Sequence, residues 1–230
     1  MAKTFFVAGT DTDVGKTVVA CGLLAAANAK GLRSLAVKPI AAGAEHCAEQ
    51  GGLRNGDALA LLEAMSEKLP YQQVNPVCLE PPIAPHIAVE LAEKRITIAQ
   101  LVGFCRGALM KPADFKLIEG AGGWRVPVNQ VESLSQLAVE MQAPVVLVVG
   151  MKLGCLNHAV LTAEAIVRDG LPLAGWVANT IDAEMPYFDE NIASLNRLLP
   201  APCLGIVPHL DMICPDKTAT YINLDHLTDG

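Results

Sequence analysis

The sequence is poor in aromatic and charged residues, which make up only 4% and 18% of its 230 residues. So few aromatic side chains argue against an aromatic-rich β-barrel and favour helices stacked on a buried parallel sheet. Long hydrophobic runs are also missing: the longest, 18–27 and 143–151, fall short of the roughly 20 residues that span a bilayer. No run of Lys or Arg occurs and the net charge is −7, which excludes a broad phosphate-backbone footprint. We therefore expect neither membrane nor nucleic-acid binding.

Paired cysteines are missing too. The seven cysteines are an odd number, lie far apart and form no Cys-x-x-Cys pair. This spacing argues against a disulfide framework and against a thiolate zinc site. The apolar segment at residues 1–8 is too short for a signal peptide. A cytoplasmic location is the expectation.

Hydrophobic residues are abundant, at 52%, and they recur in two alternating patterns. Short, nearly continuous apolar runs are typical of strands buried on both faces. They lie at Thr4–Ala8, Ser34–Lys38, Phe115–Glu119, Pro144–Val149, Leu173–Asn179 and Cys203–Val207. Segments with helical spacing lie between them, at Lys16–Lys30, Asp57–Ser66, Thr97–Met110, Ser133–Met141, His158–Asp169 and Tyr187–Leu199.

This alternation predicts an α/β fold in which helices cover both faces of one doubly wound, mostly parallel sheet of about seven strands. The proline-rich stretch Pro70–Pro85 interrupts the rhythm, and we interpret it as an elaborated crossover because no flexible spacer flanks it. The sequence contains no internal repeat. A single domain over residues 1–230 is expected.

The segment Gly9–Thr17, GTDTDVGKT, follows a predicted strand and opens a predicted helix. Strand, glycine-containing loop and helix are the context of a phosphate-binding loop. Backbone N–H groups and the helix N-terminus attract the anion, Lys16 reaches the terminal phosphates, and the Thr17 hydroxyl can ligate Mg²⁺. Five residues separate Gly9 from Gly15, one more than the usual pattern allows, because position 10 is Thr10. We predict a P-loop NTPase-like fold; a chance Gly-Lys-Thr at a helix start is the alternative.

Three further charged residues lie at the ends of predicted elements. Lys38 ends the second strand, where open α/β sheets bind ligands, although a surface lysine at a strand end is the plainer interpretation. Asp57 begins a helix, and by sequence alone an N-cap is its favoured role. Glu119 closes an apolar strand, a place where a carboxylate seldom serves packing. Thr17, Asp57 and Glu119 are the candidate Mg²⁺ ligands, since Mg²⁺ in nucleotide sites takes one or two carboxylates and a loop hydroxyl.

Taken in order, the motifs resemble the dethiobiotin synthetase family. The matching segments span nearly the whole chain: GTDTDVGKT (9–17), VKPIAAG (37–43), RNGDALAL (54–61), NPVCLEPPIAPH (75–86), EGAGGW (119–124), VVGMKLGCLNHA (148–159), LAGWVAN (173–179) and YINL (221–224). The resemblance implies an ATP-dependent ligase of biotin biosynthesis. Such an enzyme converts 7,8-diaminopelargonic acid (7,8-diaminononanoate) and CO2 to dethiobiotin, through a carbamate and a carbamic-phosphoric anhydride, and releases ADP and phosphate.

The resemblance also assigns roles to residues. Lys38, Lys16 and Thr12 are the catalytic residues, with Lys38 on the amine or carbamate and the other two on the transferring phosphoryl group. The nucleotide set comprises Asp13, Val14, Gly15, Lys16, Thr17, Val18, Asp57, Glu119, Gly120, Ala121, Gly122, Asn179, Thr180, Pro208, His209 and Leu210. Asn179 and the segment 208–210 would frame the adenine. Thr17, Asp57 and Glu119 match the family's Mg²⁺ site.

The family is a homodimer, and the neighbouring subunit binds the substrate carboxylate through the turn that matches Gly154, Cys155 and Asn157. The chain departs from the family at Ala42, where a hydroxyl residue that contacts substrate is usual. Ala84 likewise replaces a common serine, and Thr180 stands at a position where the family has an acidic residue. These positions leave substrate affinity and nucleotide preference open.

Two other functions fit part of the pattern. A nucleotide-gated switch of the ParA/MinD type shares the sheet and the loop, but such proteins usually carry a second lysine within the loop, and residues 9–14 contain none. The other alternative is a homologue that binds nucleotide with weakened turnover, which the substitutions at Ala42 and Ala84 suggest.

Overall fold

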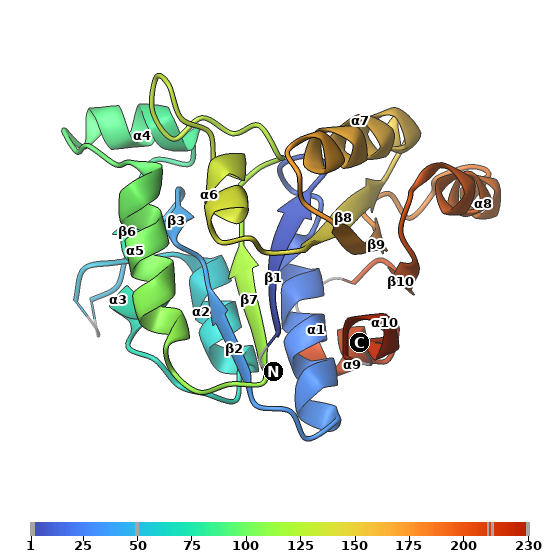
Figure 1. Ribbon diagram of the computed structural model, residues 1–230, viewed down its shortest axis with the longest axis horizontal. Coiled ribbons are helices and arrows are strands. Elements are labelled where there is room, and N and C mark those ends of the chain that lie inside the picture. The colour runs from blue at the N-terminus through green and yellow to red at the C-terminus, as the bar shows by residue number, and fades with distance from the viewer. Residues whose placement is uncertain (1–2, 49–50, 211, 213, 229–230) are drawn as a thin grey trace.

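A parallel sheet forms the centre of the molecule (Figure 1). The computed structural model describes residues 3–48, 51–210, 212 and 214–228. Within them, six strands make the main sheet, in the order β10-β9-β8-β1-β7-β2. Their bounds are β1 (Lys3–Gly9), β2 (Ser34–Val37), β7 (Phe115–Glu119), β8 (Val145–Met151), β9 (Leu173–Thr180) and β10 (Cys203–Val207).

The six strands coincide with the six apolar runs in the sequence, and the predicted parallel sheet is confirmed. Strands β7 and β8 are buried along their whole length, which explains why their sequences show no polar alternation. The count of about seven strands was one too high for this sheet. The remaining strands of the described chain have two residues each and pair apart from it: β3 (Ile40–Ala41) with β6 (Val77–Cys78), and β4 (Glu45–His46) with β5 (Leu53–Arg54).

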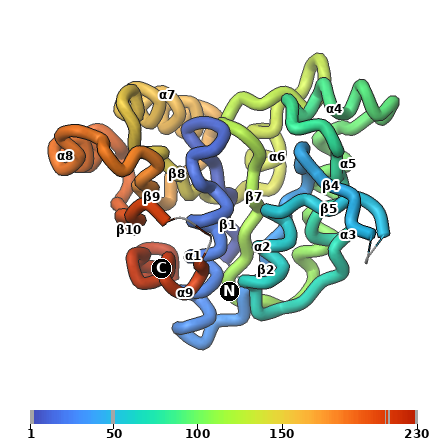
Figure 2. Tube along the Cα trace, turned by 180° about the vertical axis from the view of Figure 1, so that it is seen from behind, coloured from blue at the N-terminus to red at the C-terminus, as the bar shows by residue number. Residues whose placement is uncertain are grey.

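Helices cover both faces of the sheet, as predicted. Helices α1, α2 and α9 pack together on one face, whereas α5, α6, α7 and α8 lie on the other (Figures 1 and 2). The helices run over α1 (Lys16–Ala29), α2 (Gly56–Ala64), α3 (Tyr71–Val74), α4 (Pro85–Leu91), α5 (Ile98–Leu109), α6 (Ser135–Glu140), α7 (Cys155–Arg168), α8 (Phe188–Leu198), α9 (Pro215–Ala219) and α10 (Asp225–Thr228). Buried residues from both faces join into one hydrophobic core.

Helix starts are where the sequence-based expectations were least accurate. Helix α7 begins at Cys155, three residues before the expected start at His158, because Gly154 adopts a left-handed φ of 96° and turns the chain into the helix earlier. The expected N-cap role of Asp57 was wrong: Asn55 is the N-cap of α2, and its side chain accepts a hydrogen bond from the Ala58 N–H. Asp57 lies in the first turn, so its carboxylate is available for other contacts.

The order of connections determines where a ligand can bind. From β1 the chain crosses to β2 on one side, whereas from β8 it continues to β9 on the other. Strands β1 and β8 are neighbours, so the strand order reverses between them. Open parallel sheets bind ligands outside the carboxyl ends of strands at such a reversal. The Gly9–Thr17 loop leaves β1 at this point.

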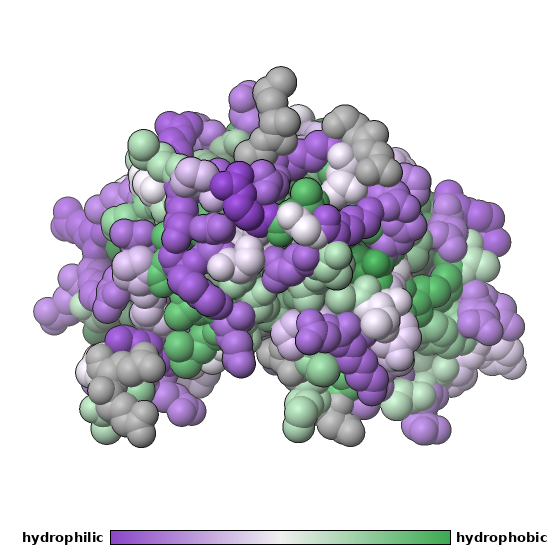
Figure 3. Space-filling view, turned by 90° about the horizontal axis from the view of Figure 1, so that it is seen from below, coloured by the Kyte–Doolittle hydropathy of each residue, from purple (hydrophilic) through white to green (hydrophobic). Residues whose placement is uncertain are grey.

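The proline-rich stretch is structured, as the crossover interpretation predicted. It contains α3, β6 and the start of α4, and β6 pairs with β3 through Ile40 and Val77. Figure 3, seen from below the view of Figure 1, shows hydrophilic side chains interspersed with small hydrophobic areas. No helix within the described part of the chain is long and apolar enough to cross a membrane.

Candidate active site

The loop between β1 and α1 is built to present backbone N–H groups. Asp13 and Gly15 both have left-handed φ angles, 56° and 82°. A side chain at Gly15 would meet Asn179, because an added Cβ would lie 2.1 Å from its Nδ2. No side chain caps the start of α1 at Gly15. The N–H groups of the first helical turn are therefore open to an anion, as a phosphate loop requires.

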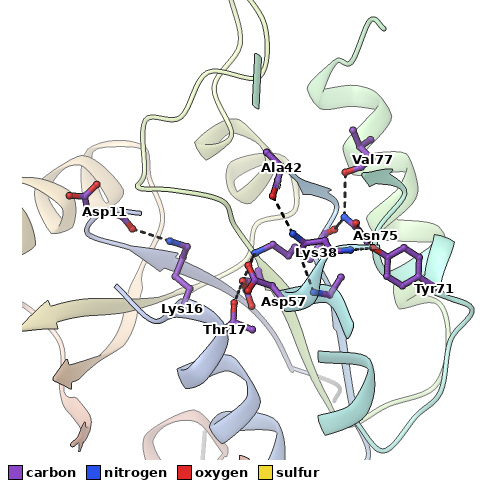
Figure 4. A network of polar contacts seen from close by, with 12 residues as sticks. Asp11, Lys16, Thr17, Lys38, Ala42, Asp57, Tyr71, Asn75 and Val77 are labelled. Carbon is purple, nitrogen blue, oxygen red and sulfur yellow. Dashed lines mark hydrogen bonds and ion pairs between the residues drawn. The ribbon is translucent and has the colours of Figure 1, made fainter. Parts of the chain in front are cut away.

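Lys16 points back over this loop. Its Nζ donates to the Asp11 carbonyl oxygen at 2.9 Å, and the residue is only 7% exposed (Figure 4). Burial lowers the pKa of Lys16 to about 8, against a raising effect of Glu119. A buried cation with a single neutral acceptor is poorly compensated in this structure, and an anion in the loop would compensate it.

Lys38 lies at the centre of a buried cluster. Its Nζ donates to Glu119 Oε1 at 2.6 Å and to Asp57 Oδ2 at 2.8 Å, and Glu119 Oε1 also accepts from the Thr17 hydroxyl at 2.8 Å (Figure 4). Lys38 is 4% exposed and Glu119 is fully buried. The contact arises because β1, β7 and β2 are consecutive in the sheet, so the residues that follow them share one edge. The surface-lysine interpretation of Lys38 was wrong.

Electrostatics hold Lys38 and Asp57 in their charged forms. Burial acts to lower the pKa of Lys38, but Glu119 and Asp57 outweigh it, so the pKa lies above its ordinary value. Burial acts to raise the pKa of Asp57, but the Lys38 ammonium and the Thr17 hydroxyl outweigh it, so that pKa lies below its ordinary value. The pair is ionised at neutral pH.

The residues expected to hold Mg²⁺ fit a divalent cation. Glu119 Oε2 is buried and has no hydrogen-bond partner, an arrangement that costs free energy unless something binds it. Thr17 donates to the same carboxylate, and Asp57 shares the Lys38 ammonium with it. The described residues contain no group of three or more His, Cys, Asp or Glu that could hold a metal. Two carboxylates and a hydroxyl suit Mg²⁺, which keeps several waters in nucleotide sites.

The glycine-rich turn after β7 packs against the phosphate loop. Gly122 has a left-handed φ of 60°, and an added Cβ would lie 3.5 Å from the Thr12 hydroxyl. At Gly123 the nearest atom to such a Cβ is the Gly9 carbonyl oxygen, at 3.7 Å. These distances are ordinary van der Waals contacts, so the turn lies directly against the loop. The turn therefore brings Gly122 beside Thr12.

Comparison with known proteins agrees with this geometry. The sequence matches the family described as "AAA domain" over residues 3–217. It is 56% identical over 228 residues to the "ATP-dependent dethiobiotin synthetase BioD" of Cellvibrio japonicus, with 99% of each chain covered. The protein of the same name from Marinobacter nauticus is 50% identical, with 100% of each chain covered.

The chain belongs to the dethiobiotin synthetase family. The family expected from the motifs, one of ATP-dependent ligases, is thereby confirmed. Among solved structures, a ParA family ATPase from Chlorobium tepidum aligns with a TM-score of 0.57 at 12% identity, covering 100% of this chain and 94% of that one. MinD complexed with Mg-ADP from Pyrococcus horikoshii aligns with a TM-score of 0.52 at 19% identity, covering 99% and 90%. These two show the shared fold alone, and the P-loop NTPase-like prediction is confirmed.

The residues expected to frame the adenine lie at the carboxyl ends of β9 and β10. Asn179 and Thr180 end β9, and β10 pairs beside it with Val207 opposite Asn179. Pro208, His209 and Leu210 follow directly. The Nδ2 of Asn179 donates to the Val14 carbonyl oxygen at 3.0 Å, which ties this edge to the phosphate loop. Val18 continues α1 from the loop.

The turn expected to bind a carboxylate is formed at the start of α7. Gly154 precedes the helix, Cys155 begins it, and Asn157 lies in its first turn. Burial raises the pKa of the Cys155 thiol, so this residue is not an activated nucleophile. Lys152 Nζ lies 3.8 Å from Asp11 Oδ2 and links the turn to the phosphate loop.

Sequence reasoning missed a layer of polar residues behind Lys38. Asn55, Tyr71 and Asn75 are buried and connect Lys38, Ala42 and α2 by hydrogen bonds (Figure 4). The available signal was weak: a tyrosine and an asparagine within the proline-rich crossover. Only the folded chain shows that this crossover returns to the site.

Proposed function

We propose that this protein is an ATP- and Mg²⁺-dependent dethiobiotin synthetase, a cyclo-ligase that forms C–N bonds. An amine of 7,8-diaminopelargonic acid adds to CO2 and loses a proton to give a carbamate. A carbamate oxygen then attacks the γ-phosphorus of ATP, which releases ADP and leaves a carbamic-phosphoric anhydride. The second amine attacks the carbonyl carbon, expels phosphate and closes the ureido ring.

The single observation that carries the proposal is the buried contact of Lys38 with Glu119 and Asp57, in a chain 50–56% identical over its full length to relatives of this name. Any phosphate loop would explain Lys16. A second buried lysine, which shares Glu119 Oε1 with the Thr17 hydroxyl, suits carbamate chemistry. An ammonium at this point neutralises an anionic carbamate and holds it in line with the γ-phosphate.

Lys16 and Thr12 would handle the phosphoryl group. The Lys16 ammonium exchanges the Asp11 carbonyl for phosphate oxygens, and this exchange replaces a neutral acceptor with a charged one. Thr12 lies beside Gly122 at the mouth of the loop, where its hydroxyl can donate to an equatorial oxygen. Asp13, Val14, Gly15 and the first turn of α1 cradle the other phosphates.

Mg²⁺ would be held by Thr17, Asp57 and Glu119. When bound, it neutralises charge on the phosphate oxygens. The unpartnered Glu119 Oε2 gives it an oxygen that is free without breaking the Lys38 contact at Oε1. The Asp57 side chain is partly exposed and lies in the first turn of α2, so its carboxylate would be accessible to the cation.

The remaining roles follow the family. We propose that the chain is a single domain over 1–230 and acts as a cytoplasmic homodimer, in which Gly154, Cys155 and Asn157 of the neighbouring copy bind the substrate carboxylate. Ala42, four residues after Lys38, would face the substrate without a hydroxyl. Asn179, Thr180 and the segment 208–210 frame the adenine.

The decisive experiment supplies purified protein with ATP, Mg²⁺, bicarbonate and 7,8-diaminopelargonic acid and follows dethiobiotin by mass. Product that requires all four components supports the proposal. A folded protein that hydrolyses ATP without forming dethiobiotin would contradict it and favour a nucleotide-gated switch. Binding of ATP without formation of dethiobiotin and without ATP hydrolysis would favour a homologue without turnover.

A lysine variant tests the assignment of Lys38. Lys38→Ala should fold but lose at least about 100-fold in kcat, the scale on which an electrostatic stabiliser acts. Lys94→Ala removes an exposed lysine and serves as the matched control. Near-normal kcat in Lys38→Ala would refute the role of Lys38.

A further inference from the structure

A buried tyrosine lies behind the cluster of Lys38, Asp57 and Glu119. Tyr71, on α3, is 8% exposed. Its hydroxyl accepts a hydrogen bond from the Asn55 backbone N–H at 2.7 Å and donates to Asn75 Oδ1 at 2.9 Å. Neither contact touches the reacting groups, and the mechanism above makes no use of them.

Each of these contacts leads to one member of the site. Asn55 is the N-cap of α2, the helix whose first turn carries Asp57. Asn75 donates from its Nδ2 to the Lys38 carbonyl oxygen at 2.7 Å. Lys38 Nζ also contacts Asp57 at 2.8 Å, and Asn55 and Asp57 are two residues apart at the start of α2, so the backbone of α2 closes these contacts into a ring (Figure 4). The Tyr71 hydroxyl joins the Lys38 half of the ring to the Asp57 half.

The partners of the Tyr71 hydroxyl are buried, which makes its loss costly. Asn55 is 6% exposed and Asn75 is 2% exposed, so water does not readily replace the hydroxyl. Loss of the hydroxyl would leave a buried N–H and a buried amide oxygen unsatisfied, and the chain relieves such a penalty by shifting. The Arg54 guanidinium lies 4.4 Å from the ring centre and fixes the ring in place.

We propose that Tyr71 is a positioning residue that fixes the distance between the Lys38 ammonium and the Asp57 carboxylate. The proposal rests on the proposed function, in which these two groups hold the carbamate and Mg²⁺. A displacement of about 1 Å in such a site can reduce a rate by about 100-fold. The phosphate loop belongs to different elements, so we expect loss of the Tyr71 hydroxyl to lower kcat more than it raises KM for ATP.

The test removes only the hydroxyl, with Tyr71→Phe. We expect kcat for dethiobiotin to fall by about ten-fold or more, with KM for ATP within about two-fold of the wild type. Tyr221→Phe, which removes the hydroxyl of a tyrosine that is 39% exposed, is the matched control and should keep full activity. Equal kcat in Tyr71→Phe and the wild type would overturn the proposal.

A double-mutant cycle with Asp57→Asn separates positioning from general stability. If Tyr71 acts through the Lys38–Asp57 contact, its removal should change kcat by less than about two-fold once Asp57 is already neutral. Full, multiplicative losses in the double variant would mean that Tyr71 only stabilises the fold. Should Tyr71→Phe not fold, Asn75→Ser opens the same ring at its other contact and should show the same dependence on Asp57.

A crystal structure of Tyr71→Phe gives a readout that needs no activity. The distance from Lys38 Nζ to Asp57 Oδ2 should exceed the 2.8 Å of the wild type, and an unchanged distance would overturn the proposal. If the wild-type protein forms no dethiobiotin, the proposed function fails, while this distance still decides the role of Tyr71.

Discussion

Among the described residues, the buried Lys16 ammonium has one hydrogen-bond partner, the neutral Asp11 carbonyl, so replacement of Lys16 by methionine should stabilise the nucleotide-free protein. Methionine keeps an unbranched chain of similar length and removes the charge. The variant would lose the cation that contacts the terminal phosphates, but its folded state would be more stable. Such a trade-off is expected where a site holds an unfavourable charge for a ligand.

The magnitude follows from the pKa of Lys16, which falls from 10.5 to about 8 in the folded protein because of burial. That difference corresponds to about 3 kcal/mol of unfavourable free energy for keeping the lysine charged. Loss of the hydrogen bond to the Asp11 carbonyl offsets about 1 kcal/mol of the gain. We therefore expect Lys16→Met to raise the free energy of unfolding at pH 7 by about 2 kcal/mol.

The difference in stability between Lys16→Met and the wild type should depend on pH. Between pH 8 and 10.5 the unfolded wild-type chain keeps a proton on Lys16 that the folded chain has lost, so its stability rises with pH in this window. The variant lacks this group. Its advantage should be full below pH 8 and should disappear as the pH approaches 10.5.

Urea unfolding followed by circular dichroism, without nucleotide, at several pH values from 7 to about 10 measures this difference. Lys94→Met, at an exposed position, is the control and should leave stability nearly unchanged. Two results would refute the reasoning: a Lys16→Met protein no more stable than the wild type at pH 7, or an advantage that persists undiminished at high pH.

Two further predictions concern single contacts. Ala42→Ser should lower KM for the diamine with little change in KM for ATP, because it supplies a hydroxyl in the segment that follows Lys38. Steady-state kinetics in which each substrate is varied in turn measure both KM values. An unchanged KM for the diamine would contradict the prediction. Asp169→Ala should lower the free energy of unfolding by about 1–3 kcal/mol, since Asp169 accepts two hydrogen bonds from the Arg125 guanidinium and one from the Trp124 indole N–H. Urea unfolding checks it, with Asp182→Ala, an exposed residue, as the control; equal losses in both variants would contradict the role of Asp169.

Local patterns in the sequence were enough for much of the fold. Apolar runs without polar alternation identified the strands, because a strand buried on both faces has no solvent-exposed face that would carry polar residues. The context of strand, loop and helix around Gly15 and Lys16 identified the phosphate loop, because its chemistry depends on backbone geometry within a few residues. The start of α7 was misplaced, since a left-handed glycine can equally end or begin an element.

The sequence by itself therefore determined which segments become strands and helices, where the phosphate loop lies, and which family the chain resembles. Only the tertiary structure decided that Lys38 meets Glu119 and Asp57, since strand order in the sheet joins residues 81 positions apart. It also decided that Asn55 caps α2 and that Tyr71 connects the two halves of the site. Such contacts are long-range and depend on burial, and no local periodicity encodes them.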